Sequence, residues 1–203
     1  ELEKGREQIQ NLDKRMRNVL VVISGPSGGG KGTLVRALLA EDDKLVESVS
    51  CTTRAPRAGE VNGIQYFFIS KEEFRDRIAA NDFLEYDEHF DNFYGTPRSF
   101  VERQLKEKSV VLEIDVVGGL NAKRLMPKSA VLIMVAPPSL EELEKRLSGR
   151  GSEDEVQLNE RMRRVRYELD QAPLYDYVVV NDDLQRAKRE IQDIIRKEKE
   201  KTI

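Results

Sequence analysis

The sequence predicts an α/β protein with a parallel sheet of five strands at its core and helices on both sides of the sheet. Runs of β-branched and aliphatic residues, such as residues 19–23 and 130–136, are typical of strands buried on both faces. Segments with apolar residues at helical spacing separate these runs, and this alternation favours parallel pairing. A glycine-rich stretch joins the first run to the first helical segment, as in loops that hold an anion at a helix N-terminus.

Strands are expected where apolar or alternating residues are bounded by turn-forming residues. The expected strands are residues 19–23, 46–53, 64–69, 83–90, 93–95, 109–116, 130–136 and 177–180. The fourth and fifth of these enclose a turn at residues 91–92, where Asp and Asn favour tight reversal. Glu113 and Asp115 fall near the end of the sixth strand, and open parallel sheets bind ligands at that end.

Helices are expected where a capping residue precedes apolar residues at helical spacing. The expected helices begin after Thr33 and occupy residues 71–81, 97–108, 139–151 and 153–171, with a polar helix after residue 183. Ser70 and Ser139 are each followed three residues later by glutamate, which is the pattern of a capping box. Thr96 and Pro97 are expected to cap the helix that follows them.

Composition limits the function classes. We expect one domain at residues 18–203, preceded at residues 1–17 by a charged extension that is either a frayed helix or a leftover of cloning. The 34 Lys and Arg against 37 Asp and Glu give a net charge of -3, which argues against nucleic-acid binding. The single cysteine, Cys51, excludes an internal disulfide, and no run suits a membrane span or a signal peptide. A cytoplasmic location is therefore expected.

The glycine-rich stretch carries a phosphate-binding pattern. Gly25, Gly30 and Lys31 satisfy G-x-x-x-x-G-K, in which backbone N–H groups and the lysine surround phosphates. Gly32 stands where Ser or Thr usually follows, and Thr33 comes one position later. A glycine-rich turn with a solvated lysine is the alternative interpretation, and the strand before and helix after the loop argue against it.

Three arginine groups could converge on phosphates. They are Arg54 with Arg57, Arg146 with Arg150, and Arg161. Guanidinium groups suit phosphate oxygens, although each arginine alone is more often a solvated surface charge. Their position in or beside Gly- and Pro-bearing loops favours a mobile segment that closes over a substrate.

Residues 50–63, Ser-Cys-Thr-Thr-Arg-Ala-Pro-Arg-Ala-Gly-Glu-Val-Asn-Gly, resemble the guanylate kinase family, and further matches continue in order along the chain. These further matches are Tyr66, residues 83–85, 94–96 and 146–151, and residues 180–183. The resemblance implies a three-layer P-loop NTPase fold and ATP-dependent conversion of GMP to GDP in purine nucleotide metabolism. It further implies a core at about 18–50, 97–140 and 172–203, a mixed α/β GMP-binding region at about 51–96, and a helical lid at about 141–171.

For GMP, the resemblance implies contacts from Ser50, Arg54, Arg57, Glu60, Tyr66, Glu85, Tyr94, Thr96, Glu113 and Asp115. The arginines and tyrosines of this set would bind the phosphate, and Glu60 would orient the arginines. Glu85 would accept from the guanine N1 hydrogen and 2-amino group, because a wrong base leaves a buried polar group unpaired. GMP is the expected acceptor, with dGMP as a further candidate.

For ATP, the resemblance implies contacts from Gly25, Pro26, Ser27, Gly28, Gly29, Gly30, Lys31, Gly32, Thr33, Arg146, Arg150 and Asn181. The catalytic set that it implies is Lys31, Arg54, Arg146, Arg150 and Arg161. Mg²⁺ is expected with ATP, held mainly by phosphates and water, with Thr33 as the one candidate protein ligand. No general base is required, because the attacking phosphate oxygen is already anionic.

The chain departs from the family pattern at Val117, where Gln is commoner, and at Glu113, where Asp is commoner. Two alternatives stay open: an inactive phosphopeptide-binding module with this fold, and a kinase for another nucleoside monophosphate. The intact Lys31 loop argues against the first alternative. Glu85 with Ser50 argues against the second. A monomer and a homodimer are equally compatible with the sequence.

Overall fold

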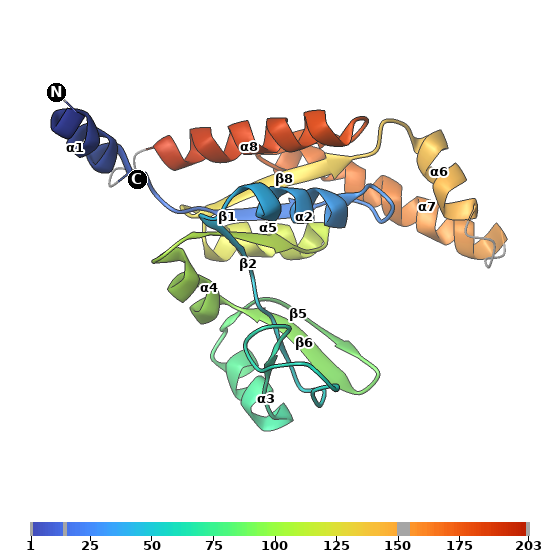
Figure 1. Ribbon diagram of the computed structural model, residues 1–203. Helices are drawn as coiled ribbons and strands as arrows, with labels where there is room; N and C mark the ends of the chain where they lie inside the picture. Colours follow the sequence, from blue (N-terminus) through green and yellow to red (C-terminus); the bar gives the residue numbers. More distant parts are fainter. Residues whose placement is uncertain (1, 14–15, 150–154, 202–203) are drawn as a thin grey trace.

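The computed structural model describes residues 2–13, 16–149 and 155–201 (Figure 1). Its main sheet contains β1 (Leu20–Ser24), β2 (Leu45–Glu47), β7 (Ser109–Glu113), β8 (Ala130–Ala136) and β9 (Tyr177–Val180). The strand order is β2-β7-β1-β8-β9 and every pairing is parallel. The predicted five-stranded parallel core is therefore confirmed.

Helices cover both faces of this sheet. One face packs against α2 (Lys31–Glu41) and α8 (Leu184–Glu200), and the other against α4 (Arg98–Leu105) and α5 (Val116–Leu125). The side chains of β1 alternate between the two layers, so Val21 points to the first and Val22 to the second, and both are fully buried. Burial of such a side chain contributes about 1.5–3 kcal/mol. This two-sided core holds the carboxyl end of β1, and the loop that follows it, in a fixed position.

Two further helices extend beyond the sheet. They are α6 (Leu140–Ser148) and α7 (Glu155–Asp170), which pack together through a small apolar cluster of Leu143, Leu147, Met162 and Val165. The Ser139 hydroxyl accepts from the Glu142 N–H at 3.0 Å, so the predicted start of α6 is confirmed. A short 3₁₀ helix, Ala172–Leu174, leads from α7 back to β9.

A second sheet forms a separate lobe below the main body (Figure 1). It consists of β4 (Phe67–Phe68), β3 (Cys51–Thr52), β6 (Asn92–Pro97) and β5 (Phe83–His89), in that order, and α3 (Lys71–Ala79) packs on it. The ring of Phe74 in α3 stacks on Phe83 and Phe93, with centroids 4.4 and 5.0 Å apart. Ser70 caps α3 as predicted, because its hydroxyl accepts from the Glu73 N–H. The lobe thus has its own aromatic core.

Two strand predictions were wrong in extent. The expected strand 46–53 is divided between the two sheets, since β2 ends at Glu47 and β3 begins at Cys51. The expected strand 64–69 shrinks to Phe67–Phe68, and Ile64 is largely exposed in the turn before it. Apolar content alone could not locate the point at which the chain leaves one sheet for the other.

One prediction at a helix start was wrong, and another was confirmed in position only. The expected strand 109–116 ends at Glu113, and Asp115 instead caps α5, which the sequence reading did not include, by accepting from the Gly118 N–H at 2.7 Å. Pro97 is the N-cap residue of α4, as expected, but it supplies no side-chain hydrogen bond to the helix start. Asp82, in a turn distant along the chain, supplies that hydrogen bond by accepting from the Ser99 N–H at 3.0 Å.

The terminal helix α8 was expected to be polar but is amphipathic. Its buried face carries Ala187, Ile191, Ile194 and Ile195, which pack on the main sheet. None of the helices in the described ranges is both long and apolar enough to cross a membrane.

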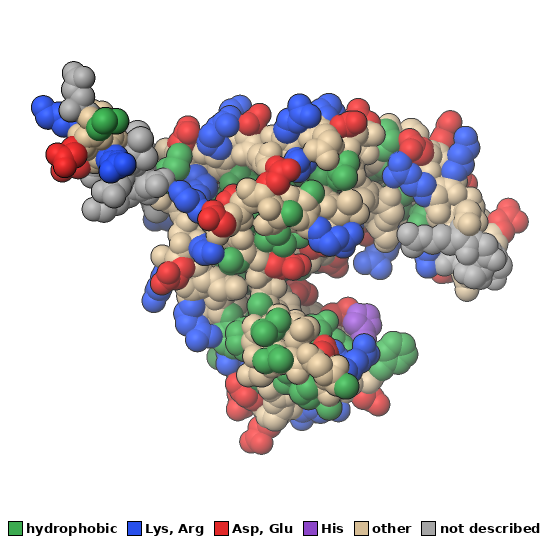
Figure 2. Space-filling view, viewed as in Figure 1, with side chains coloured by type: hydrophobic (Ala, Val, Ile, Leu, Met, Phe, Trp, Pro, Cys, Tyr) green, Lys and Arg blue, Asp and Glu red, His purple; other side chains and the backbone are tan. Residues whose placement is uncertain are grey.

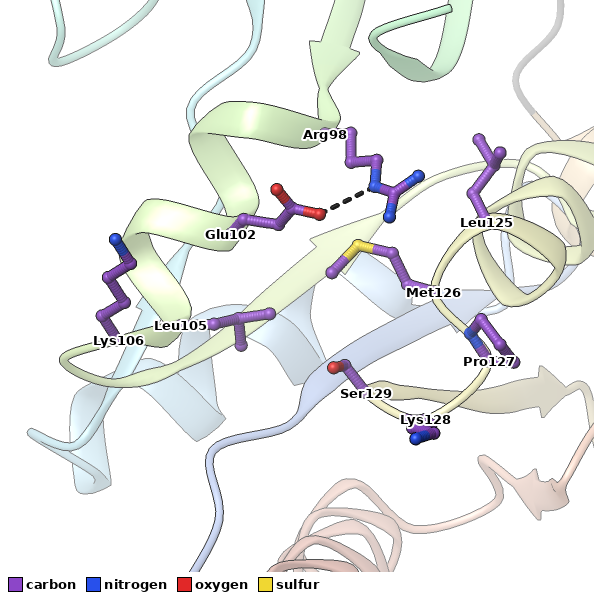
Figure 3. A pocket seen from close by; sticks show the side chains of 9 residues that line it. All are labelled: Arg98, Glu102, Leu105, Lys106, Leu125, Met126, Pro127, Lys128 and Ser129. Carbon is purple, nitrogen blue, oxygen red and sulfur yellow. Dashed lines mark hydrogen bonds and ion pairs between the residues drawn. The ribbon is translucent and has the colours of Figure 1, made fainter. Parts of the chain in front are cut away.

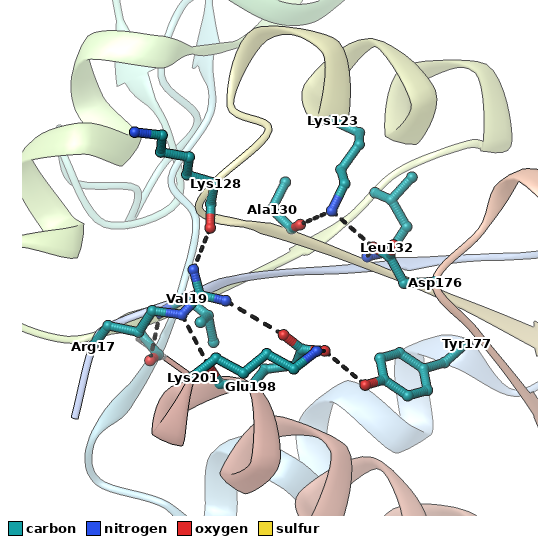
Figure 4. A network of polar contacts seen from close by, with 11 residues as sticks. Arg17, Val19, Lys123, Lys128, Ala130, Leu132, Asp176, Tyr177, Glu198 and Lys201 are labelled. Atoms are coloured by element: carbon teal, nitrogen blue, oxygen red, sulfur yellow. Dashed lines mark hydrogen bonds and ion pairs between the residues drawn. The ribbon is translucent and has the colours of Figure 1, made fainter. Parts of the chain in front are cut away.

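The N-terminal extension is helical as α1 (Leu2–Asp13) and is tied to the body just after it (Figure 4). The Arg17 guanidinium donates to the Glu198 backbone carbonyl at 2.9 Å, to the Glu198 carboxylate at 3.3 Å, and to the Lys128 carbonyl. Glu198 is buried and also accepts from the Tyr177 hydroxyl at 2.6 Å. This network joins the start of the domain to α8 and to the loop before β8.

Candidate functional site

The loop between β1 and α2 is compact and contains glycines in backbone conformations that other residues rarely adopt. Gly25 has φ 143°, and a Cβ there would meet the Val135 carbonyl oxygen at 2.2 Å. Gly30 has φ 80°, and a Cβ there would meet the Asn181 amide nitrogen at 2.5 Å. Any other residue would therefore be strained and would clash at these two positions. The Lys31 ammonium lies against this loop and donates to the carbonyls of Gly25 and Pro26, the latter at 3.1 Å.

Two side chains that are distant in sequence donate hydrogen bonds to carbonyl groups of the loop. The Asn181 amide donates to the Gly29 carbonyl at 2.7 Å from the end of β9. Arg146 of α6 reaches the Gly28 carbonyl at 3.4 Å and pairs with Glu142 at 2.6 Å. Sequence reasoning grouped both residues with the loop, and the fold brings them to it.

The second lobe carries a cluster around Arg54. Its guanidinium forms a two-pronged pair with Glu60, at 2.8 and 3.1 Å, and lies over the ring of Tyr66, 5.4 Å from the centroid. Tyr66 and Tyr94 contact edge to face, with ring centroids 5.9 Å apart. The Arg54 hydrogen bond, together with the Arg57 backbone N–H, lowers the pKa of Glu60 to about 2. The cluster therefore presents a fixed guanidinium beside two phenolic hydroxyls.

Three polar side chains of the same lobe form a chain. The Thr96 hydroxyl donates to the Glu85 carboxylate at 2.9 Å and lies 3.1 Å from the Ser50 hydroxyl. Burial raises the pKa of Glu85, and the Thr96 hydrogen bond offsets part of that rise. Glu85 is thus a partly buried carboxylate with a fixed orientation.

A cavity of about 270 Å³ joins the loop to the carboxyl end of β7. It is lined by Gly25, Ser27, Lys31, Glu113, Ile114, Asp115, Arg164 and Glu168. Burial lowers the pKa of Lys31, and the negative charges of Glu113 and Glu168 oppose that effect. Figure 2 shows that the surface is hollowed between the second lobe and the main body. The molecule therefore has a glycine-rich loop with a lysine and a guanidinium cluster on two lobes separated by a cleft.

The comparisons with known proteins decide which family has this arrangement. A family model described as guanylate kinase matches residues 15–198. The chain belongs to the guanylate kinase family. A guanylate kinase of Clostridium perfringens (strain SM101 / Type A) is 47% identical over 94% of this chain and 88% of that protein. A guanylate kinase of Clostridioides difficile (strain 630) is 46% identical over 91% and 90%. The crystal structure of guanylate kinase from Anaplasma phagocytophilum is 35% identical, with a TM-score of 0.67 over 93% of this chain and 89% of that one.

Not every residue suggested by the guanylate kinase resemblance reaches these clusters. Arg57 joins Glu60 through its backbone N–H at 2.7 Å, while its side chain is exposed. Arg161 of α7 is exposed and lines a cavity of about 410 Å³ with Gln157, Glu160 and Arg164. Arg150 lies outside the described residues.

Sequence reasoning missed Arg164 and Glu168. Both line the cavity beside Lys31, and Glu168 is buried. The available signal was their spacing of four, which places both on one helix face. This spacing does not show which part of the protein that helix face contacts, because the position of α7 relative to the loop is a property of the tertiary structure.

Two observations concern groups outside the clusters described above. A larger cavity of about 420 Å³ lies between α4 and the turn before β8, lined by Arg98, Glu102, Leu105, Lys106, Leu125, Met126, Pro127, Lys128 and Ser129 (Figure 3). It shares no residue with the Lys31 cavity. His89, the single histidine, is exposed and contacts Asp87 at 2.8 Å. Within the described ranges, no three His, Cys, Asp or Glu residues gather as a metal site.

Proposed function

We infer that this enzyme transfers the γ-phosphoryl group of ATP to GMP, giving ADP and GDP, in the cleft between the two lobes. One observation supports this most strongly. The cavity beside Lys31 is lined by Asp115, whose charge acts on Glu85 of the second lobe, and the surface is hollowed between that lobe and the main body (Figure 2). Two phosphate-bearing molecules, one at the loop and one at the Arg54 cluster, could therefore meet end to end. Membership of the guanylate kinase family gives the reaction its substrates.

The Arg54 cluster would bind the phosphate of GMP. Arg54 and Arg57 supply positive charge, and Tyr66 and Tyr94 supply hydroxyl donors to the dianion. Glu60 would orient Arg54, because its two oxygens hold the guanidinium in one plane.

The chain of Ser50, Thr96 and Glu85 would recognise the guanine base. Guanine presents its N1 hydrogen and 2-amino group side by side, and a carboxylate can accept from both. The Thr96 hydroxyl fixes Glu85 in place for this purpose. Glu113 and Asp115 complete the proposed acceptor site from the main body, and both line the shared cavity.

The donor would lie along the phosphate loop. Loop N–H groups surround the β- and γ-phosphates, while Lys31 exchanges its loop carbonyls for phosphate oxygens. Arg146, Arg150 and Arg161 would approach from the lid, and Asn181 stands on the adenine side. An oxygen of the GMP phosphate bonds to the γ-phosphorus, and the bond from that phosphorus to the bridging oxygen breaks as ADP leaves. Alignment and charge neutralisation supply the catalysis.

Mg²⁺ would accompany ATP, bound mainly by phosphate oxygens and water. The Thr33 hydroxyl is exposed in the first turn of α2, directly after the loop, and accepts from the Arg36 guanidinium at 3.3 Å. An oxygen that already accepts from a cationic group would fit a cation shared with phosphates, which would replace this contact. The ion would neutralise charge on the transferring group.

The proposed division into core, GMP-binding region at 51–96 and lid at 141–171 gives the cleft two movable walls. The second sheet and the α6–α7 pair are the structural units that support it. We further propose a cytoplasmic enzyme, monomeric or homodimeric, that accepts dGMP as well as GMP and binds neither nucleic acid nor membrane. The composition, with one cysteine and a net charge of -3, supports this.

The test is a panel of nucleoside monophosphates assayed for ADP formation with ATP and Mg²⁺. GMP is expected to be the preferred acceptor. Lys31→Ala should lower kcat by at least about 100-fold without unfolding the protein. Lys197→Ala, at an exposed position of α8, is the matched control. Equal rates for all monophosphates, or full turnover by Lys31→Ala, would contradict the assignment, and phosphopeptide binding without turnover would favour the inactive module.

A further inference from the structure

Two residues of α7 lie beside the phosphate loop and have no part in the proposed mechanism. Arg164 and Glu168 are one helical turn apart, and the Arg164 Nε donates to the Glu168 carboxylate at 3.0 Å. Both line the cavity that contains Lys31. They come from the same helix as Arg161, which was implicated from the sequence.

The two partners differ sharply in exposure. The Glu168 side chain is 11% exposed, whereas the Arg164 side chain is 70% exposed. A buried carboxylate requires a charged or hydrogen-bonded partner, so Glu168 has a physical reason to hold Arg164. An ion pair with one exposed partner contributes little to stability, so stability alone does not explain an arginine that lines the cavity beside Lys31.

Arg164 also connects two cavities. It lines the 270 Å³ cavity with Lys31 and the 410 Å³ cavity with Arg161. The charges of Arg164 and Glu168 both act on the Lys31 ammonium and shift its pKa in opposite directions, burial being the larger effect. Arg164 is therefore located between the loop lysine and the lid arginine.

We propose that Arg164 contacts the transferring phosphoryl group and that Glu168 is a positioning residue that holds it there. This inference rests on the proposed reaction. During transfer, negative charge is spread over the equatorial oxygens of the phosphoryl group. The Glu168 contact uses Nε, so the two terminal nitrogens are the ones that reach the phosphoryl oxygens.

The first test compares Arg164→Ala with Arg163→Ala, an exposed neighbour on the same helix. Arg164→Ala should lower kcat about tenfold and leave the KM for GMP nearly unchanged, since a charged hydrogen bond to the reacting group is lost. Arg163→Ala should retain wild-type kinetics. Millimolar guanidinium should restore part of the Arg164→Ala rate and should not accelerate the wild type. Thermal unfolding of each variant separates loss of function from loss of structure.

The second test is a double-mutant cycle with Glu168→Ala. If Glu168 acts only through Arg164, the double variant should be no slower than Arg164→Ala alone. Arg164→Lys keeps the positive charge but lacks the planar guanidinium group. Its kcat should therefore lie between those of the wild type and Arg164→Ala.

The two proposals fail in different ways. A wild-type enzyme that does not convert GMP to GDP would refute the proposed function and this inference with it. An active wild type, combined with equal rates for Arg164→Ala and Arg163→Ala, would overturn the role of Arg164 and leave the function standing. Additive effects in the cycle would remove Glu168 as a positioning residue.

Discussion

Replacing Glu85 with glutamine changes one oxygen to an amide in the middle of the Ser50–Thr96–Glu85 chain. The Thr96 hydroxyl can still donate to the remaining oxygen, since the native contact at 2.9 Å needs a single acceptor. The new amide group, however, would face one of the two guanine donors with a donor of its own. The substitution therefore tests base recognition with little change in shape.

The expected loss follows from the hydrogen bonds involved. A hydrogen bond to a charged group contributes about 1.5–3 kcal/mol, so kcat/KM for GMP should fall about 10- to 100-fold. AMP lacks this pair of donors, so its rate should not fall and the preference for GMP over AMP should shrink by the same factor. IMP lacks the 2-amino group, so kcat/KM for IMP should fall less than kcat/KM for GMP.

The pKa of Glu85 provides a stability control. Burial raises this pKa, so the folded state binds the proton of Glu85 more tightly than the unfolded chain does. Ionised Glu85 is therefore a cost to folding above its folded-state pKa, and that cost is relieved as the pH falls. Glu85→Gln should consequently keep the wild-type Tm at neutral pH or exceed it.

The assay is a coupled measurement of ADP formation with GMP, IMP and AMP, with thermal unfolding of the same samples. Unchanged discrimination among the three acceptors would remove Glu85 from base recognition. A lower Tm together with an equal loss of kcat/KM for all three acceptors would identify a structural effect instead.

Two further predictions concern stability. Asp82→Ala should cost about 1–2 kcal/mol in urea denaturation, because Asp82 accepts from the Ser99 N–H and hydroxyl at the start of α4. The exposed Asp76→Ala serves as its control, and equal midpoints for both would refute the cap. Glu60 has its pKa lowered from 4.5 to about 2 through Arg54, so its stabilising contribution is complete above pH 4.5 and is lost as the pH falls toward 2. The Tm difference between wild type and Glu60→Gln should therefore be largest near neutral pH and shrink in acid; a constant difference would argue against the pair.

Much of the fold could be predicted because it depends on local or repetitive features of the chain. The buried character of β1 and β8 follows from unbroken aliphatic residues, and two of the helix starts follow from Ser70 and Ser139. Membership of the guanylate kinase family, and with it the conversion of GMP to GDP by ATP, was likewise reached from the order of short motifs and is confirmed by the comparisons.

The failures at helix starts have two causes. Asp82 caps a helix that begins sixteen positions later, so local sequence could not identify it. Asp115 caps its helix from only three residues away, but the glycines of that helix weakened its helical signal. Periodicity reports which face of an element is apolar. It does not report which sheet a strand joins, so the division of residues 46–53 was not predictable from it.

The amino-acid sequence by itself determined the phosphate loop, because φ angles that only glycine tolerates and a lysine beside a helix start are local properties of consecutive residues. Only the tertiary structure decided that Arg164 and Glu168 of α7 line the cavity beside Lys31 while Arg163 does not. The physical reason is that the chemistry of a charged side chain depends on what the packing of distant elements brings within a few ångströms of it.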